Sequence, residues 1–122
     1  MRPDVAAYLW DALQAARAAR SFTMNAEYSC FVDDTMRRSA VERQLEILGE
    51  ALNRVRRSDP EVSARIPEIA QIIGMRNIIV HEYGNIDHRL VWDLTWLIVG
   101  WLGCWGLVVV GIVGGCVGWG AH

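Results

Sequence analysis

Four side chains with useful chemistry lie close together in one otherwise apolar stretch of the chain: Arg76, Asn77, His81 and Tyr83. Arginine is a permanent cation whose planar fork matches the oxygens of a phosphate group. Histidine is the side chain that most readily takes and gives a proton near neutral pH. Because these two groups are the minimum equipment for cleaving a phosphodiester without a metal ion, we predict that Arg76 and His81 are catalytic and that Asn77 supports them.

The roles follow from the chemistry of RNA cleavage. A neutral His81 would take the proton of a 2′-hydroxyl, and its protonated form would give one to the leaving 5′-oxygen. Arg76 would stabilise the charge of the phosphorane-like transition state, and Asn77 would orient a phosphate oxygen or His81 itself. On spacing alone, a solvated helix face with a histidine near its end explains the same residues without catalysis.

Helix geometry separates the two central residues. Asn77 and His81 are four positions apart, roughly 40° around a helix, so they share a face. Arg76 and His81 are five positions apart, roughly 140° around, so they do not stack on each other. A second copy of this helix in a symmetric dimer would supply the missing half of a site.

Composition limits the class of protein. A chain of 122 residues with a formal net charge of −2 is one domain without a broadly electropositive surface for nucleic acid. The three cysteines have no CxxC spacing, which predicts a reduced, cytoplasmic protein without a zinc site. The N-terminus carries no long apolar run, so no secretory signal is predicted.

Residues 1–93 have the pattern of a helical domain. Apolar residues recur every three or four positions from Val5 to Ala16, which predicts a first helix, and a polar connection is expected at 21–25. A heptad-like apolar seam predicts a long helix from about Thr35 to Arg57. Its members are Val41, Leu45, Leu48, Leu52 and Val55.

Capping residues place the shorter helices. Asp59 suits the cap and Pro60 the first position of a short helix, and Pro67 would open the next one in the same way. That helix carries the motif and is expected to end at Gly84. Asp87 is the expected cap of a helix that begins near residue 88.

Five charged residues of the long helix are interpreted as solvated surface. Glu46 and Glu50 share a face at a spacing that is common on exposed helices. Arg54, Arg56 and Arg57 form a small basic cluster at the end of the same helix. A solvated C-terminal turn explains this cluster better than RNA binding does.

Residues 94–122 differ abruptly from the rest, because no Asp, Glu, Lys or Arg follows Asp93. Three interpretations of this apolar, Gly- and Trp-rich tail compete. The run is long enough to span a membrane, and its glycines have the small-xxx-small spacing of membrane helices. It can also be a buried core helix. The third interpretation is an aberrant, frame-shifted replacement of the last helix, because a GC-rich gene read out of frame yields such a composition.

The signature Arg76–His81–Tyr83, an Arg, four residues, a His, one residue and a Tyr, with Asn77 after the Arg, resembles the HEPN ribonucleases. More narrowly it resembles the HepT toxins of toxin–antitoxin pairs. The run from Val41 to Leu52 is similar to the long central helix of that family. The likeness covers roughly residues 3–93.

The resemblance implies an all-α, HEPN-type bundle of about five helices that forms a homodimer, with the motif helices facing each other. It implies a metal-independent endoribonuclease without a cofactor, the toxin of a type VII-like toxin–antitoxin system, with RNA as substrate. Arg76 and His81 would be catalytic and Asn77 supporting. Its partner would be an MntA-type nucleotidyltransferase antitoxin, which transfers AMP from ATP onto the motif tyrosine, here Tyr83. The tail departs from the amphipathic final helix of the family.

Two rival functions remain open at this stage. The first is a catalytically silent helical dimer that binds a nucleotidyltransferase. The second is a membrane-anchored effector that uses residues 95–119. The joint presence of Arg76, Asn77 and His81 favours the enzyme.

Overall fold

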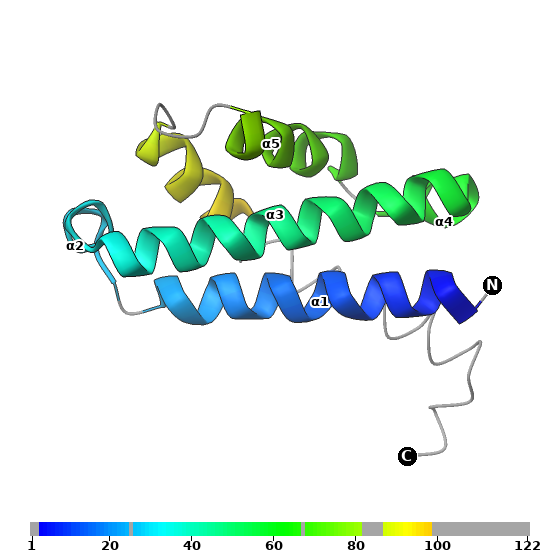
Figure 1. The fold of residues 1–122 in the computed structure, drawn as a ribbon, viewed down its shortest axis with the longest axis horizontal. Helices are drawn as coiled ribbons and strands as arrows, with labels where there is room; N and C mark the ends of the chain where they lie inside the picture. The colour runs from blue at the N-terminus through cyan, green and yellow to red at the C-terminus, as the bar shows by residue number, and fades with distance from the viewer. Residues whose placement is uncertain (1–2, 25, 67, 82–86, 99–122) are drawn as a thin grey trace, which may run out of the picture.

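The chain folds as a bundle of helices packed around one long central helix. The computed structural model describes residues 3–24, 26–66, 68–81 and 87–98, and every structural statement below refers to these residues. Within these ranges there is no strand, so the prediction of an all-α fold is confirmed. The helices are α1 (Pro3–Thr23), α2 (Tyr28–Asp33), α3 (Thr35–Ser58), α4 (Pro60–Ala64) and α5 (Ile69–His81), and residues 88–98 form a further helix (Figure 1).

Helix α3 is the centre of the bundle. Helix α1 runs antiparallel along one side of it, and α5 lies across the opposite side (Figure 1). The predicted heptad-like seam is buried along the whole length of α3, and the predicted bounds agree with the observed ones to within one residue. From α1, aliphatic and small side chains complete the core. They are Val5, Leu9, Ala12, Leu13, Ala15, Ala16 and Ala19.

The predicted capping residues of α4 act as expected, and α3 has a side-chain cap as well. The Asp59 carboxylate accepts a hydrogen bond from the Val62 amide at 3.2 Å, and Pro60 occupies the first turn of α4. At the other end of α3, Asp34 accepts from the Arg37 amide at 3.1 Å. These contacts satisfy amide donors that have no partner inside the helix.

The predicted connection at 21–25 is wrong for its first three residues, because α1 continues through Thr23. The Ser21 hydroxyl donates to the Ala18 carbonyl at 2.8 Å, and the buried Thr23 hydroxyl donates to the Ala19 carbonyl at 3.1 Å. The helix itself therefore satisfies the polar side chains that had indicated a loop.

The helix over residues 88–98 is tied to α2 by aromatic rings. Its amide at Arg89 donates to the Asp87 carboxylate at 2.9 Å, which confirms Asp87 as the cap. The Trp92 ring lies 5.1 Å from the Phe31 ring and 5.8 Å from the Tyr28 ring, between centroids. A third ring, that of Trp96, lies 5.6 Å from Trp92.

The predicted division after residue 93 falls inside this helix. Leu94, Thr95 and Ile98 are buried, so the core-facing side of the helix continues past the last charged residue. Residues 99–122 lie outside the described part of the chain, so the interpretations of the tail stay predictions. Over the residues that are described, none of the helices has the length and apolarity to cross a membrane.

Candidate active site

Helix α5 presents its polar residues at the border between the core and the surface. Its apolar side chains Ile72, Ile73, Met75 and Ile79 are buried, which fixes the rotation of the helix against the bundle. The first polar residue of the motif, Arg76, therefore lies at the edge of the packed face, with 25% of its side chain exposed.

A glycine on α3 allows α5 to approach α3 closely at Arg76. Gly49 is buried, and a Cβ atom placed on it would collide with Arg76 Cβ and lie 2.7 Å from Arg76 Cγ. Because Cβ–Cβ contacts of this kind are forbidden by sterics, the approach of α5 to α3 requires a residue without a side chain. The base of the Arg76 side chain is thus held against the α3 backbone.

The guanidinium of Arg76 is oriented by two neighbours. Its Nη2 atom lies 3.2 Å from Oε2 of Glu50, and its Nη1 donates to the Asn77 Oδ1 at 3.0 Å. Both partners are partly exposed, so the ion pair contributes less than about 1 kcal/mol to stability. Its main consequence is a fixed direction for the cation.

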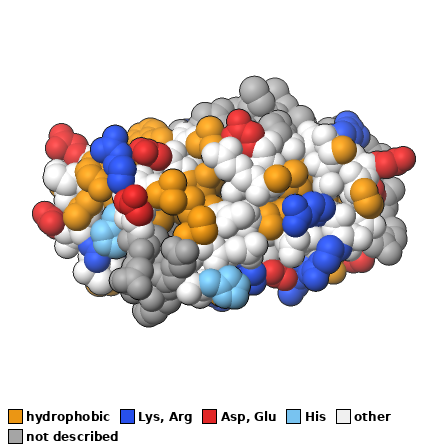
Figure 2. All heavy atoms as spheres, turned by 90° about the horizontal axis from the view of Figure 1, so that it is seen from above, with side chains coloured by type: hydrophobic (Ala, Val, Ile, Leu, Met, Phe, Trp, Pro, Cys, Tyr) orange, Lys and Arg blue, Asp and Glu red, His pale blue; other side chains and the backbone are white. Residues whose placement is uncertain are grey.

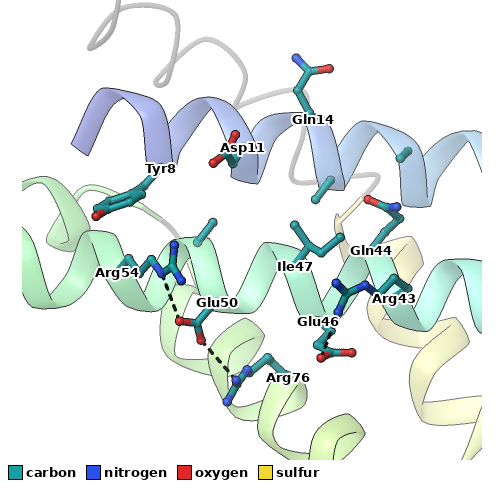
Figure 3. A pocket seen from close by; sticks show the side chains of 13 residues that line it. Tyr8, Asp11, Gln14, Arg43, Gln44, Glu46, Ile47, Glu50, Arg54 and Arg76 are labelled. Atoms are coloured by element: carbon teal, nitrogen blue, oxygen red, sulfur yellow. Dashed lines mark hydrogen bonds and ion pairs between the residues drawn. The ribbon is translucent and has the colours of Figure 1, made fainter. Parts of the chain in front are cut away.

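Glu50 also binds two arginines of its own helix, α3. The Arg54 Nε donates to Glu50 Oε1 at 3.2 Å (Figure 3). An Nη atom of Arg57 lies 3.8 Å from the same oxygen. One carboxylate therefore stands among three guanidinium groups, and positive charge is in local excess. Such a cluster can attract an anionic group such as a phosphate.

The structure brings some of the predicted site residues together and leaves one apart. Arg76 and Asn77 are joined by a hydrogen bond, whereas His81 lies exposed in the last turn of α5. Within the described residues, no hydrogen bond or ion pair connects His81 to Arg76 or Asn77. Tyr83 lies outside the described residues, so its predicted role stays a prediction.

The residue that sequence reasoning missed is Glu50. It had been interpreted as solvated surface together with Glu46, and Arg54 and Arg57 as a solvated helix end. The spacing of Glu50 and Arg54 does indicate a pair along one helix, and this is the only hint that the sequence offers. The link from Glu50 to Arg76 joins two helices and depends on the fold.

A groove lies beside the Arg76 guanidinium, between α1 and α3 (Figure 3). Its volume is about 610 Å³. Arg76 lines it from α5, whereas Asn77 and His81 do not. In the described part of the chain, no cluster of three or more His, Cys, Asp or Glu side chains is arranged to hold a metal ion.

The face over α5 is partly apolar. Figure 2 views the molecule from this side, and hydrophobic side chains gather across the middle of the face with arginines on both sides of them. Val80 on α5 is 37% exposed, and Leu90 on the next helix is 42% exposed. Apolar side chains close to a charged motif are typical of a surface that is covered in an assembly.

A bundle with Arg76, Asn77 and His81 on one helix, beside a long helix with an apolar seam, has the features of a HEPN domain. The comparison with known families agrees. Residues 12–95 match the sequence pattern of the family described as Ribonuclease HepT-like. This range includes α3, α5 and the three motif residues, and the chain belongs to this family.

Individual relatives give the same result. The chain is 37% identical over 92 residues to "Putative RNase MJ1380" of Methanocaldococcus jannaschii. The aligned residues make up 75% of this chain and 84% of the relative. It is 33% identical over 90 residues to "Putative RNase MJ1216" of the same organism, covering 74% of each. It is 34% identical over 89 residues to "Probable ribonuclease HepT" of Thermococcus cleftensis, covering 70% of this chain and 76% of the relative. No solved structure matches the chain significantly.

Proposed function

We propose that this chain is a metal-independent endoribonuclease and the toxin of a toxin–antitoxin pair. The observation that carries the proposal is the placement of Arg76, Asn77 and His81 on α5, inside the region that matches the ribonuclease family. The names of the relatives as RNases support the same activity.

In this proposal, Arg76 stabilises the pentavalent transition state of RNA cleavage. Its cation is held in place by Glu50 and Asn77, so little reorganisation is needed when charge develops on the phosphate. His81 removes the proton of the 2′-hydroxyl, which attacks the adjacent phosphorus. It then returns the proton to the departing 5′-oxygen, leaving a 2′,3′-cyclic phosphate.

We further propose that the active unit is a homodimer. Arg76 points toward α3 and Glu50, while His81 is exposed more than one turn further along α5. A second copy packed on the apolar face over α5 would place the two α5 helices opposite each other. His81 of one protomer would then approach Arg76 of its partner, as a two-fold axis allows.

The proposed antitoxin is a nucleotidyltransferase that transfers AMP from ATP to Tyr83. Tyr83 is two positions from His81 along the chain, so a modified Tyr83 would add negative charge close to the proposed general base. A bound AMP group would repel the RNA backbone and occupy its space. The family to which the chain belongs is the support for this part of the proposal.

The test is cleavage of RNA by the purified protein in EDTA. We expect Arg76→Ala and His81→Ala each to lower the cleavage rate by about 10²–10³-fold, because each removes a group that acts on the transition state. Gln71→Ala is the matched control, since Gln71 is an exposed residue of the same helix. The product of the wild type should end in a 2′,3′-cyclic phosphate.

Two outcomes would contradict the proposal. Equal cleavage by the wild type and both variants would show that a contaminant or another site cuts the RNA. A folded, dimeric wild type that leaves RNA intact would instead favour the silent helical dimer that binds a nucleotidyltransferase.

A further inference from the structure

The groove between α1 and α3 shares Arg76 with the proposed active site. We propose that this groove holds one nucleoside of the substrate RNA, the one whose phosphate is bound at Arg76. The inference rests on the proposed ribonuclease function and adds to it a base-binding subsite on α1 and α3.

The size and floor of the groove fit a single nucleoside. Its volume of about 610 Å³ lies within the range of roughly 300–1,000 Å³ that small-molecule sites occupy. Small side chains of both helices line the groove, Ala15 and Ala18 from α1 and Ala51 from α3. The Ile47 side chain of α3 also lines it (Figure 3). An aliphatic lining of this kind can pack against the face of a base.

One end of the groove carries two planar groups. The Arg54 guanidinium carbon lies 5.8 Å from the centroid of the Tyr8 ring. Bases in single-stranded RNA are commonly held by stacking on aromatic rings and on guanidinium planes. Because Arg54 is bound to the same Glu50 carboxylate that holds Arg76, this end is connected directly to the proposed phosphate site.

The charges of the groove favour a base over a run of phosphates. Three arginines line it, and so do three carboxylates. They are Arg43, Arg54 and Arg76, and Asp11, Glu46 and Glu50. The lining is formally neutral, whereas a groove that follows several phosphates is positively charged. Only the edge at Arg76 therefore suits a phosphate, and the rest suits the uncharged part of a nucleotide.

The rim also offers groups for hydrogen bonds to a base. The Asp11 carboxylate forms no hydrogen bond or ion pair within the described residues and faces the groove from α1 (Figure 3). The Gln44 side chain reaches from α3 toward α1 on the other side. A carboxylate can accept both adjacent N–H donors of the Watson–Crick edge of guanine, so guanosine 3′-monophosphate is a suitable probe.

The experiment titrates the full-length, ¹⁵N-labelled protein with guanosine 3′-monophosphate and separately with inorganic phosphate, followed by NMR. We expect the nucleotide to shift amides of α1 around Asp11 and of α3 around Ile47, and phosphate alone to leave α1 unchanged. Ala18→Leu fills the groove and Asp11→Asn removes the charged acceptor, so each should weaken nucleotide binding about tenfold or more. Arg17→Gln, at an exposed position of α1 that does not line the groove, should bind like the wild type.

The same variants tested on RNA separate this inference from the proposed function. Both groove variants should raise KM for RNA and leave kcat nearly unchanged, because neither residue acts on the reacting atoms. Asp11→Asn is exposed and cannot fail by misfolding of the core, so it decides the matter if Ala18→Leu does not fold.

Three results would overturn the inference. These are nucleotide-induced shifts confined to α5, equal shifts with phosphate alone, or wild-type binding and KM in both groove variants. If both groove variants show wild-type binding and KM and still cleave RNA, the groove is not a subsite but the ribonuclease proposal is unaffected. Nucleotide binding in the groove by a wild type that cuts no RNA would instead remove the ribonuclease and keep the subsite.

Discussion

The two sides of α3 are packed with different chemistry. Toward α1, the buried contact consists of aliphatic and alanine side chains spread over several turns, such as Leu9 and Leu13. Toward α5, buried side chains such as Ile72 and Ile79 also pack into the core. The closest approach of the two helices, however, requires the missing side chain at Gly49 and lies beside one ion pair, between Glu50 and Arg76. The first contact has many small contributions, so it supplies stability. The second positions a single cation and tolerates almost no change in shape.

The largest stability effect should come from the α1 side. Leu9 is fully buried, so Leu9→Ala removes its packing and leaves a cavity, which should lower the free energy of unfolding by about 2–5 kcal/mol. Cleavage per folded molecule should stay unchanged, because Leu9 does not line the groove or touch the motif. Urea unfolding and RNA cleavage below the transition measure both quantities. A variant of full stability would show that the α1 contact is not the main source of stability.

Gly49→Ala tests the α5 side. The added methyl group collides with the Arg76 side chain at its base, so α5 must move away from α3. We expect a loss of about 1–3 kcal/mol of stability from overpacking, together with a fall in cleavage rate, because Arg76 is displaced. The unfolding midpoint and the rate per folded molecule are the measurements.

Gly74→Ala is the matched control on α5 itself. A methyl group at Gly74 meets open space, so alanine there should stabilise the helix by about 0.5–1 kcal/mol and leave cleavage unaltered. Equal behaviour of the two glycine variants would refute the view that the α5 contact is set by the shape of one position.

The smallest expected effect concerns Glu42, on the part of α3 near His88. Partial burial raises the pKa of Glu42 above its ordinary value of 4.5, and the nearby His88 and Arg38 oppose this shift. The stabilisation of its neutral form is therefore fully present below pH 4.5 and is lost as the pH rises through the raised pKa.

Glu42→Gln replaces the ionisable carboxyl group by a neutral amide, so this pH-dependent loss of stability should not occur in the variant. At neutral pH the variant should be slightly more stable than the wild type, by less than about 0.5 kcal/mol, and the difference should vanish below pH 4.5. Thermal unfolding at several pH values measures it. A variant that is less stable than the wild type at pH 7 would mean that the attraction to His88 and Arg38 outweighs the burial.

Local sequence patterns predicted much of the fold. The spacing of the apolar residues gave the extent of α3, and Asp59 with Pro60 located the start of α4, because capping depends on neighbours within three positions. The predicted end of α1 was wrong. Ser21 and Thr23 are residue types common in loops, but their hydroxyl groups donate hydrogen bonds to carbonyls of their own helix.

The candidate site was predictable in part. Arg76, Asn77 and His81 were selected from their types and spacing, and their catalytic roles stay predictions, although the family match covers all three positions. Glu50 was not recognised, because its contact with Arg76 joins residues 26 positions apart, as the numbering shows. Sequence periodicity describes neighbours on one helix, and it contains no information on which two helices cross at Gly49.

The aromatic contacts of Trp92 have a consequence for spectroscopy. Its ring is held at fixed angles to three other rings, from Tyr28, Phe31 and Trp96, in an asymmetric arrangement. Aromatic side chains in such fixed surroundings produce near-ultraviolet circular dichroism, which disappears when tertiary packing is lost even if helices persist. The near-ultraviolet signal therefore reports on the packing of α2 against the helix over residues 88–98, whereas the far-ultraviolet signal reports on the helices of the whole bundle.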